Sequence, residues 1–263
     1  MVLERLITVK TAISDPLWVF VIGGIISVVC LFTSFVIFKE SIGLFTSLLI
    51  TIAVTPLMLR LIRYDEKKEE TDTEELSRMN IFQRHRDVLK VYTAFFCGMI
   101  LSLSIVYLML PANTVEELFG DQINEINIIR GNVAFGGNFQ KIIFNNIGVL
   151  FLSFLLSFLL GAGAIFILAW NASVLSTAIG IAAKSIGGVK GLPLAVLMFF
   201  PHGSLEILAY FIGAMAGGLI STAITRKKSP KFMFILNDTG QLMAISIVIL
   251  IFAALIEVVQ LPA

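Results

Sequence analysis

A histidine and a glutamate lie inside one of the most apolar stretches of this chain. They belong to the sequence Pro-His-Gly-Ser-Leu-Glu at residues 201–206, between an uncharged run from Leu192 and another that ends at Thr225. An imidazole or a carboxyl group at membrane depth is costly, and such groups usually carry a function there. His202 and Glu206 are spaced so that both side chains lie on one face of a helix. This stretch is therefore the first candidate for any chemistry that the protein performs.

A catalytic or metal-binding role needs more groups than this stretch offers. A His and a Glu at this spacing can face one ion, but the chain has 2 histidines, and the other is His85 in a charged segment. Zinc sites usually have about three or four protein ligands, and the sequence has no HExxH, CxxC or Gly-x-Ser-x-Gly motif. Ser204 beside His202 does not by itself make a nucleophile and base pair. We therefore expect no metal and no cofactor, and an intramembrane hydrolase ranks third among the functions considered.

Two further interpretations use the same side chains without catalysis. His202 and Glu206 could titrate in a conduit for protons or a small solute, because intramembrane acids and histidines recur in relays. They could equally form a structural hub, pairing with each other or with polar side chains of neighbouring helices and so fixing helix register. The candidate partners in such a hub are Asn145, Asn146, Asn171 and Lys184. Binding of a protein partner is compatible with the hub.

The composition indicates a protein that crosses a membrane several times. Of 263 residues, 57% are hydrophobic and 14% are charged, whereas soluble domains carry about 25% charged residues. The mean hydropathy is +0.95. The formal net charge of +1 gives no basic field that would attract nucleic acid. We predict an all-α transmembrane helical bundle whose surroundings are the lipid bilayer and other proteins.

Apolar runs of about 20 residues are long enough to span a bilayer. The sequence predicts about seven crossings, at Pro16–Phe38, Ile42–Ile62, Val91–Leu110, Ile147–Trp170, Ala172–Ile186, Leu192–Thr225 and Phe232–Leu261. The segment 172–186 is the least secure, because it is short and could instead re-enter the membrane together with residues 192–200. As one helix, residues 192–225 would be roughly 51 Å long, well above the ~30 Å hydrocarbon core. We therefore predict that this helix is broken at Pro201, His202 and Gly203.

The charges concentrate in one segment, which divides the chain into three parts. These are an N-terminal transmembrane hairpin at residues 1–62, a charged cytoplasmic linker at residues 63–90, and a membrane domain at residues 91–263. Within the linker, Asp65–Glu75 is predicted to be solvated, and Leu76–Lys90 is predicted to be a helix that leads into the membrane.

The basic loops predict the orientation in the membrane. The linker and the loop Arg226–Lys231 carry Lys and Arg residues that favour the cytoplasmic side. Seven crossings then place the N-terminus in the cytoplasm and the C-terminus outside. The long connection from Asn113 to Asn145 lies outside, and its apolar residues predict a partly helical segment that lies on the membrane surface or dips into it.

From about residue 91 to residue 263, the chain resembles the stage II sporulation protein M family of integral membrane proteins. The residues that carry the resemblance are Phe144-Asn145-Asn146 before a span, Gly161 and Gly163 late in that span, Asn171 just after it, and Pro201-His202-Gly203 with Glu206. The Pro-His-Gly-x-x-Glu stretch is the most specific of these. The glycines also suit the close approach of another helix.

The resemblance implies a core of five spans, to which the N-terminal hairpin is an addition. In spore formers, the family member is regarded as the membrane scaffold of a complex whose partners cut the cell wall during engulfment of the forespore. We therefore expect a non-enzymatic component of an envelope-associated complex in the plasma membrane of a prokaryote, with protein partners and possible self-association. A transporter or channel-like protein is the main alternative. The expected site is a polar membrane cluster of Asn145, Asn146, Asn171, Pro201, His202, Gly203 and Glu206.

Overall fold

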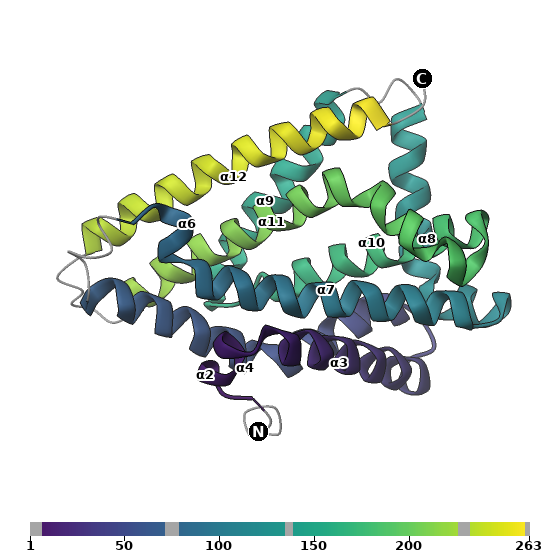
Figure 1. Cartoon of the computed structure of the whole chain (residues 1–263), viewed down its shortest axis with the longest axis horizontal. Coiled ribbons are helices and arrows are strands. Elements are labelled where there is room, and N and C mark those ends of the chain that lie inside the picture. The colour runs from purple at the N-terminus through teal and green to yellow at the C-terminus, as the bar shows by residue number, and fades with distance from the viewer. Residues whose placement is uncertain (1–6, 72–78, 135–138, 226–231, 261–263) are drawn as a thin grey trace.

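The computed structural model describes residues 7–71, 79–134, 139–225 and 232–260, and all regular elements among them are helices. The helices are α2 (Val9–Ser14), α3 (Pro16–Ile37), α4 (Ile42–Thr71), α6 (Ile81–Arg84), α7 (Arg86–Met109), α8 (Ala112–Ala134), α9 (Phe139–Leu160), α10 (Ile165–Ile186), η1 (Gly188–Gly191), α11 (Leu192–Thr225) and α12 (Phe232–Gln260). The described residues contain 7 helices that are long and apolar enough to cross a membrane. The prediction of an all-α polytopic bundle is confirmed (Figure 1).

Helices α3 and α4 form a hairpin whose first helix has a well-defined start. The Asp15 carboxylate accepts a hydrogen bond from the Trp18 backbone N–H at 3.2 Å, and Pro16 occupies the first turn, where its missing N–H costs nothing. At the turn of the hairpin, the rings of Phe38 and Phe45 stack with their centroids 3.7 Å apart. Helix α7 then packs along α3, so the hairpin is joined to the rest of the bundle.

Helix α4 continues well beyond the predicted end of its span. It runs to Thr71, and Asp65 within it is only 1% exposed. The prediction that Asp65–Glu75 is a solvated linker is therefore wrong for Asp65, whereas Lys67 is exposed; residues 72–78 lie outside the described residues. The physical reason is that the Asp65 carboxylate pairs with the buried side chain of His85, a contact that a count of charges along the sequence does not show.

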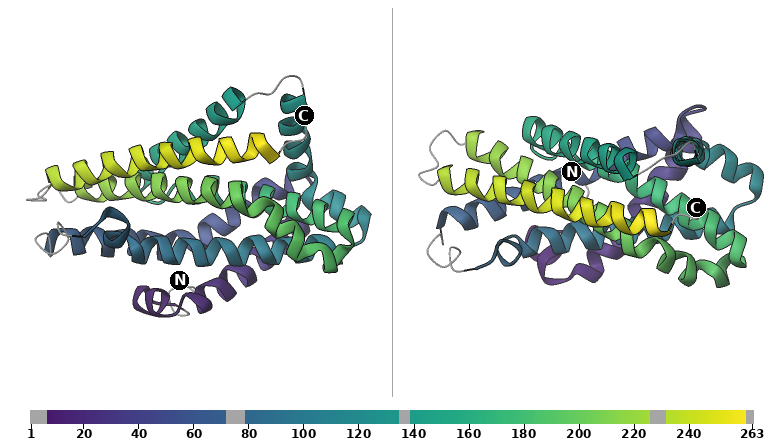
Figure 2. Two further views of the ribbon diagram at one scale, coloured as in Figure 1. Left: turned by 45° about the horizontal axis from the view of Figure 1, so that its top comes forward. Right: turned by 90° about the horizontal axis from the view of Figure 1, so that it is seen from above.

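Helix α8 lies crosswise at one end of the bundle, near the end of α12 (Figures 1 and 2). Its apolar side chains Val115, Leu118 and Phe119 are buried in a helix that packs against α4 and α10. The Asp121 carboxylate accepts a hydrogen bond from the Gly43 backbone N–H at 2.9 Å, which fixes α8 to the first turn of α4. The helical part of the prediction for this connection is confirmed, although α9 already begins at Phe139.

The predicted boundary between the fourth and fifth spans is wrong. Helix α9 ends at Leu160 and α10 begins at Ile165, so Trp170 belongs to α10 rather than to the end of the preceding span. The turn between the two helices needs Gly161, whose φ of 76° is a left-handed conformation that other residues adopt at a cost. The uncertain segment 172–186 is consequently the second part of a 22-residue helix, and not a short separate element.

The predicted break in α11 is absent. This helix is continuous over 34 residues and contains Pro201 in its interior. A proline removes one backbone hydrogen bond, and the helix tolerates that loss here. The prediction assumed that a helix must fit the thickness of the bilayer, whereas α11 is packed along much of its length against α9, α10 and α12.

Candidate functional site

Helices α9, α11 and α12 bring most of the predicted polar residues together. A Cβ atom at Gly213 would meet Leu150 Cδ1 at 2.4 Å, and one at Gly217 would meet the Phe154 backbone oxygen at 2.2 Å. Residue numbers rise in the same direction along both helices in these two pairs. Helices α9 and α11 are therefore parallel neighbours in very close contact. The same register continues one turn further to Asn146 on α9. The glycines of α11 thus set the distance at which Asn146 meets the Pro-His-Gly motif.

The central contact of the site joins Asn146 to Glu206. The Asn146 side-chain Nδ2 donates to Glu206 Oε1 at 2.5 Å, and Asn146 is 6% exposed. The amide of Asn145 in turn donates to Asn146 Oδ1 at 3.3 Å. Asn145 itself is exposed on the surface of α9. The two asparagines therefore form a chain of hydrogen bonds that runs from the surface of the bundle to the carboxyl group of Glu206.

A second carboxyl group completes the site. Glu257, near the end of α12, lies within hydrogen-bonding reach of Glu206, and His202 is close enough to interact electrostatically with Glu257. A carboxylate has only acceptor oxygens, so a hydrogen bond between two carboxyl groups requires a proton on one of them. We call Asn145, Asn146, His202, Glu206 and Glu257 the polar cluster. It connects three helices and can hold a proton or a cationic group.

Three predicted site residues lie elsewhere. Asn171 is on α10, and its Nδ2 donates to the backbone oxygen of Ile167 in its own helix at 2.8 Å. Gly161 and Gly163 belong to the turn between α9 and α10, so they do not sit inside a span as predicted. Gly161 still has a packing role, because its backbone oxygen lies 2.9 Å from where a Cβ of Gly218 would be. These glycines shape a turn against α11 at some distance along the chain from the polar cluster.

Glu257 is a site residue that the sequence analysis did not identify. A signal was present, because Glu257 is an acid within a long apolar segment, as Glu206 is. Pro201 and Gly203 are in the helix beside the cluster, and a Cβ at Gly203 would make only ordinary contacts, at 3.5 Å, with Leu175. Among the residues that the structure describes, no three His, Cys, Asp or Glu side chains are grouped in a way that could hold a metal ion.

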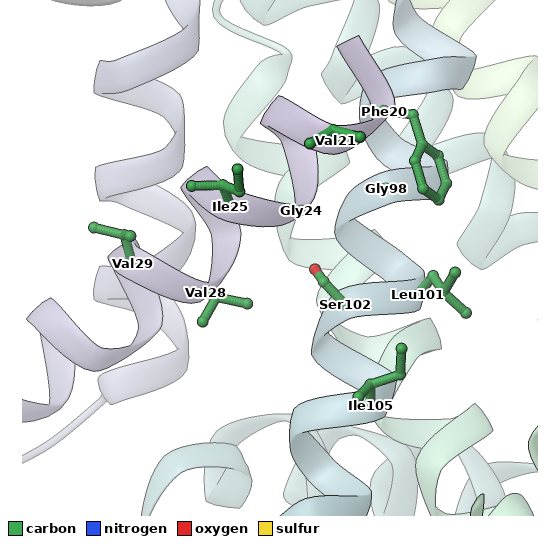
Figure 3. A pocket seen from close by; sticks show the side chains of 10 residues that line it. All are labelled: Phe20, Val21, Gly24, Ile25, Val28, Val29, Gly98, Leu101, Ser102 and Ile105. Atoms are coloured by element: carbon green, nitrogen blue, oxygen red, sulfur yellow. The ribbon is translucent and has the colours of Figure 1, made fainter. Parts of the chain in front are cut away.

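A separate groove lies between α3 and α7 (Figure 3), and none of the residues that line it belongs to the polar cluster. It has a volume of about 440 Å³ and is lined mainly by aliphatic side chains such as Val21, Ile25, Leu101 and Ile105. The hydroxyl of Ser102, visible in Figure 3, already donates to the backbone oxygen of Met99 at 3.0 Å. The groove thus presents hydrocarbon, and the polar cluster remains the candidate site.

Comparison with known proteins establishes the family. A sequence model described as stage II sporulation protein M matches residues 17–259. The chain belongs to the stage II sporulation protein M family. The match includes α3 and α4, so the hairpin that the sequence analysis set apart as an addition lies inside the region shared with the family. The resemblance that rested on residues 91–263 is confirmed and extended.

The chain is also similar to an uncharacterized protein of Methanocaldococcus jannaschii. It is 29% identical over 169 residues, which cover 62% of this chain and 90% of the relative. No solved structure matches the chain. The comparisons therefore give the family of this integral membrane protein, and the polar cluster is the basis for any statement about its role.

Proposed function

We propose that this protein is a non-enzymatic scaffold in an envelope-associated membrane complex. The observation that supports this role most directly is that the polar groups of the Pro-His-Gly-x-x-Glu motif contact other helices of the same chain. Asn146 of α9 donates to Glu206 of α11, and Glu206 is within hydrogen-bonding reach of Glu257 of α12. Such contacts hold helices in a fixed register. The motif then serves to present a defined surface to a partner.

The surface next to the cluster suits a protein partner in the membrane. Phe144 is 74% exposed beside Asn145 on α9, and Phe151 and Leu155 further along the same helix are 50% and 47% exposed. An exposed amide within a lipid-facing helix is costly in hydrocarbon, and the helix of a partner can supply it with a hydrogen bond. The polar cluster is therefore proposed to position α9 so that this face meets the partner.

The test compares two substitutions of Glu206 that separate a hydrogen-bonding role from a titrating role. Glu206→Ala removes the acceptor for Asn146, whereas Glu206→Gln keeps an acceptor oxygen at the same place and cannot ionise. Each variant is tagged, expressed in its native host, purified with its partners and analysed by quantitative mass spectrometry. The matched control is Glu117→Ala on the exposed surface of α8.

The scaffold proposal expects a partner that copurifies with the wild type, Glu206→Gln and Glu117→Ala but is lost from Glu206→Ala. Equal recovery of every protein with Glu206→Ala, in a variant that is folded and present at the wild-type level, would overturn it.

A second candidate is a transporter that uses the polar cluster as a proton or solute site. The observation in its favour is the contact between two carboxyl groups, Glu206 and Glu257, in apolar helices, both of which are only half-buried. This alternative predicts that Glu206→Gln abolishes proton or solute flux in proteoliposomes while every partner is retained. Wild-type flux in Glu206→Gln would exclude it.

We also propose the orientation expected from the basic loops, in the plasma membrane of a prokaryote. The N-terminus and the loop 226–231 then lie in the cytoplasm, and α8 and the C-terminus lie outside. The asymmetry of Lys and Arg between the loops supports this. Alkaline phosphatase and green fluorescent protein fused to the C-terminus provide the test. Activity of the phosphatase fusion with a dark fluorescent fusion is expected, and the reverse pattern would contradict it.

A further inference from the structure

A second group of buried charges lies at the other end of α12 from Glu257. Asp65, His85 and Asp238 are 1%, 0% and 0% exposed, and they come from α4, the corner between α6 and α7, and α12. The side chain of Arg84 joins them from α6 and is 10% exposed. At about 1.5 Å per residue along α12, this group is roughly 28 Å from the polar cluster. It is thus independent of the site described above.

The imidazole of His85 lies between two carboxylates. Its Nδ1 is 2.6 Å from Asp65 Oδ2, and its Nε2 is 3.6 Å from Asp238 Oδ2. The Arg84 guanidinium donates to Asp238 Oδ1 at 2.6 Å and also contacts Asp238 Oδ2. Arg84 lies over the ring of Phe234 as well, 5.3 Å from its centroid. Each carboxylate therefore faces a ring nitrogen of the same histidine, and one of them also faces an arginine.

This geometry favours a doubly protonated imidazole, although the distance from Nε2 to Asp238 is that of a charge contact and not of a hydrogen bond. A neutral imidazole has one N–H and one bare nitrogen, and the bare nitrogen would direct its lone pair at a carboxylate. In the doubly protonated ring both nitrogens are donors, so both carboxylates are matched. A charged His85 thus adds a second base to the Arg84 guanidinium that already contacts Asp238. Removing one partner of a buried ion pair is strongly destabilising, because the charge that remains has no compensation.

We propose that His85 is a proton-dependent latch that fastens the corner between α6 and α7 to α4 and α12. The latch is closed when the imidazole carries two protons, and it opens when the ring loses one. Its position suits this role because a very short helix meets the start of a long one at this corner. Helix α6 is only 4 residues long and begins with a capping box formed by Asn80 and Gln83, and α7 begins at Arg86 without a side-chain cap.

A second ion pair near the corner between α6 and α7 contributes little to holding the corner in place. Lys68 of α4 is 3.6 Å from Asp87 of α7, and both side chains are partly exposed, so this pair is screened by water and contributes little. Charged groups in direct contact at the latch come from each helix around it: Asp65 from α4, Arg84 from α6 and Asp238 from α12. Loss of the imidazole proton removes the positive charge that lies between Asp65 and Asp238.

The direction of the pH effect follows from the proton count. The closed state holds one proton more than the open state, so raising the pH favours opening. Over the range in which the open state has lost the proton and the closed state retains it, the open population rises by about tenfold per pH unit. Histidine is the side chain suited to such a response between about pH 5 and 8.

The charge on the ring can be measured without a substitution at His85. The full chain is labelled with ¹⁵N-histidine and reconstituted in lipid nanodiscs. Because the chain has 2 histidines, His202→Gln leaves a single labelled ring. At the acidic end of the range, both ring nitrogens are expected to show the chemical shifts of an imidazolium. Shifts of a neutral ring with one protonated nitrogen under these conditions would overturn the proposal.

Opening is measured by hydrogen exchange of the amides in residues 81–90, corrected for the intrinsic pH dependence of exchange. The wild type and His202→Gln should lose protection by about tenfold per pH unit as the pH rises through the transition. His85→Gln cannot gain or lose this proton, so its corrected protection should not vary with pH. Wild-type protection that stays constant with pH, or a pH dependence that persists in His85→Gln, would contradict the latch.

Discussion

The close contact between α9 and α11 gives the sharpest structural prediction, for Gly217→Ala. The added Cβ would lie 2.2 Å from the Phe154 backbone oxygen, and ordinary contact begins at 3.4 Å. Because the obstacle is backbone, α9 has to retreat by about 1.2 Å, a strain of the overpacking kind that typically costs ~1–3 kcal/mol. The same retreat stretches the bond between Asn146 and Glu206 from 2.5 Å to roughly 3.7 Å, which is no longer a hydrogen bond.

Loss of an interhelical hydrogen bond in a membrane protein adds about 0.6 kcal/mol on average. Gly217→Ala should therefore lower the free energy of unfolding by roughly 2–4 kcal/mol. Reversible unfolding with SDS in mixed micelles measures the loss. Spin labels on α9 and α11, in a background without Cys30 and Cys97, measure the separation of the helices.

The matched control for this prediction is Gly148→Ala on α9, where an added Cβ meets nothing within 4 Å. It should leave both quantities unchanged or stabilise α9 slightly, since alanine is the better helix former. The reasoning fails if Gly217→Ala is as stable as Gly148→Ala and the distance between α9 and α11 is unaltered.

Four further substitutions test other parts of the structure, each by the same unfolding assay. Asn146→Ala should cost about 0.6–1.7 kcal/mol, and the exposed Asn145→Ala less, because only Asn146 bonds Glu206 directly; equal costs would contradict this ranking. Gly161→Ala should cost about 1–2 kcal/mol because of its left-handed φ, and a neutral result would mean that the turn relaxes. Arg84→Ala should cost about 3–5 kcal/mol because it removes the guanidinium that contacts both oxygens of the buried Asp238; a loss near zero would show that water reaches the carboxylate.

Hydropathy was enough to predict the class of fold and the number of spans. The lengths of the apolar runs and the basic loops between them determine both, and neither depends on side-chain contacts. The boundary between α9 and α10 was missed because Gly161, Ala162 and Gly163 are as apolar as the helices that they separate. A turn buried inside the bundle has no polar signature, and only the backbone angle of Gly161 reveals it.

The candidate site was predicted in part, for an equally physical reason. Glu206 was conspicuous because no charge lies near it in the sequence, and Asn146 was a reasonable partner because it begins another span. Nothing in one sequence specifies that Asn171 faces its own helix or that Glu257 reaches Glu206. The buried pair of Asp65 and His85 was missed because their charges fall among many others, where composition suggests solvent.

The most direct test of the scaffold account is partner recovery in a double-mutant comparison at the bond between Asn146 and Glu206. Partner recovery from native membranes is measured for Asn146→Ala, Glu206→Ala and the double variant, at matched levels of folded protein. If the bond positions the partner-binding face, each single variant loses the partner to a similar extent, and the double variant loses no more than either. Unchanged recovery in all three, or losses that multiply in the double variant, would contradict the account.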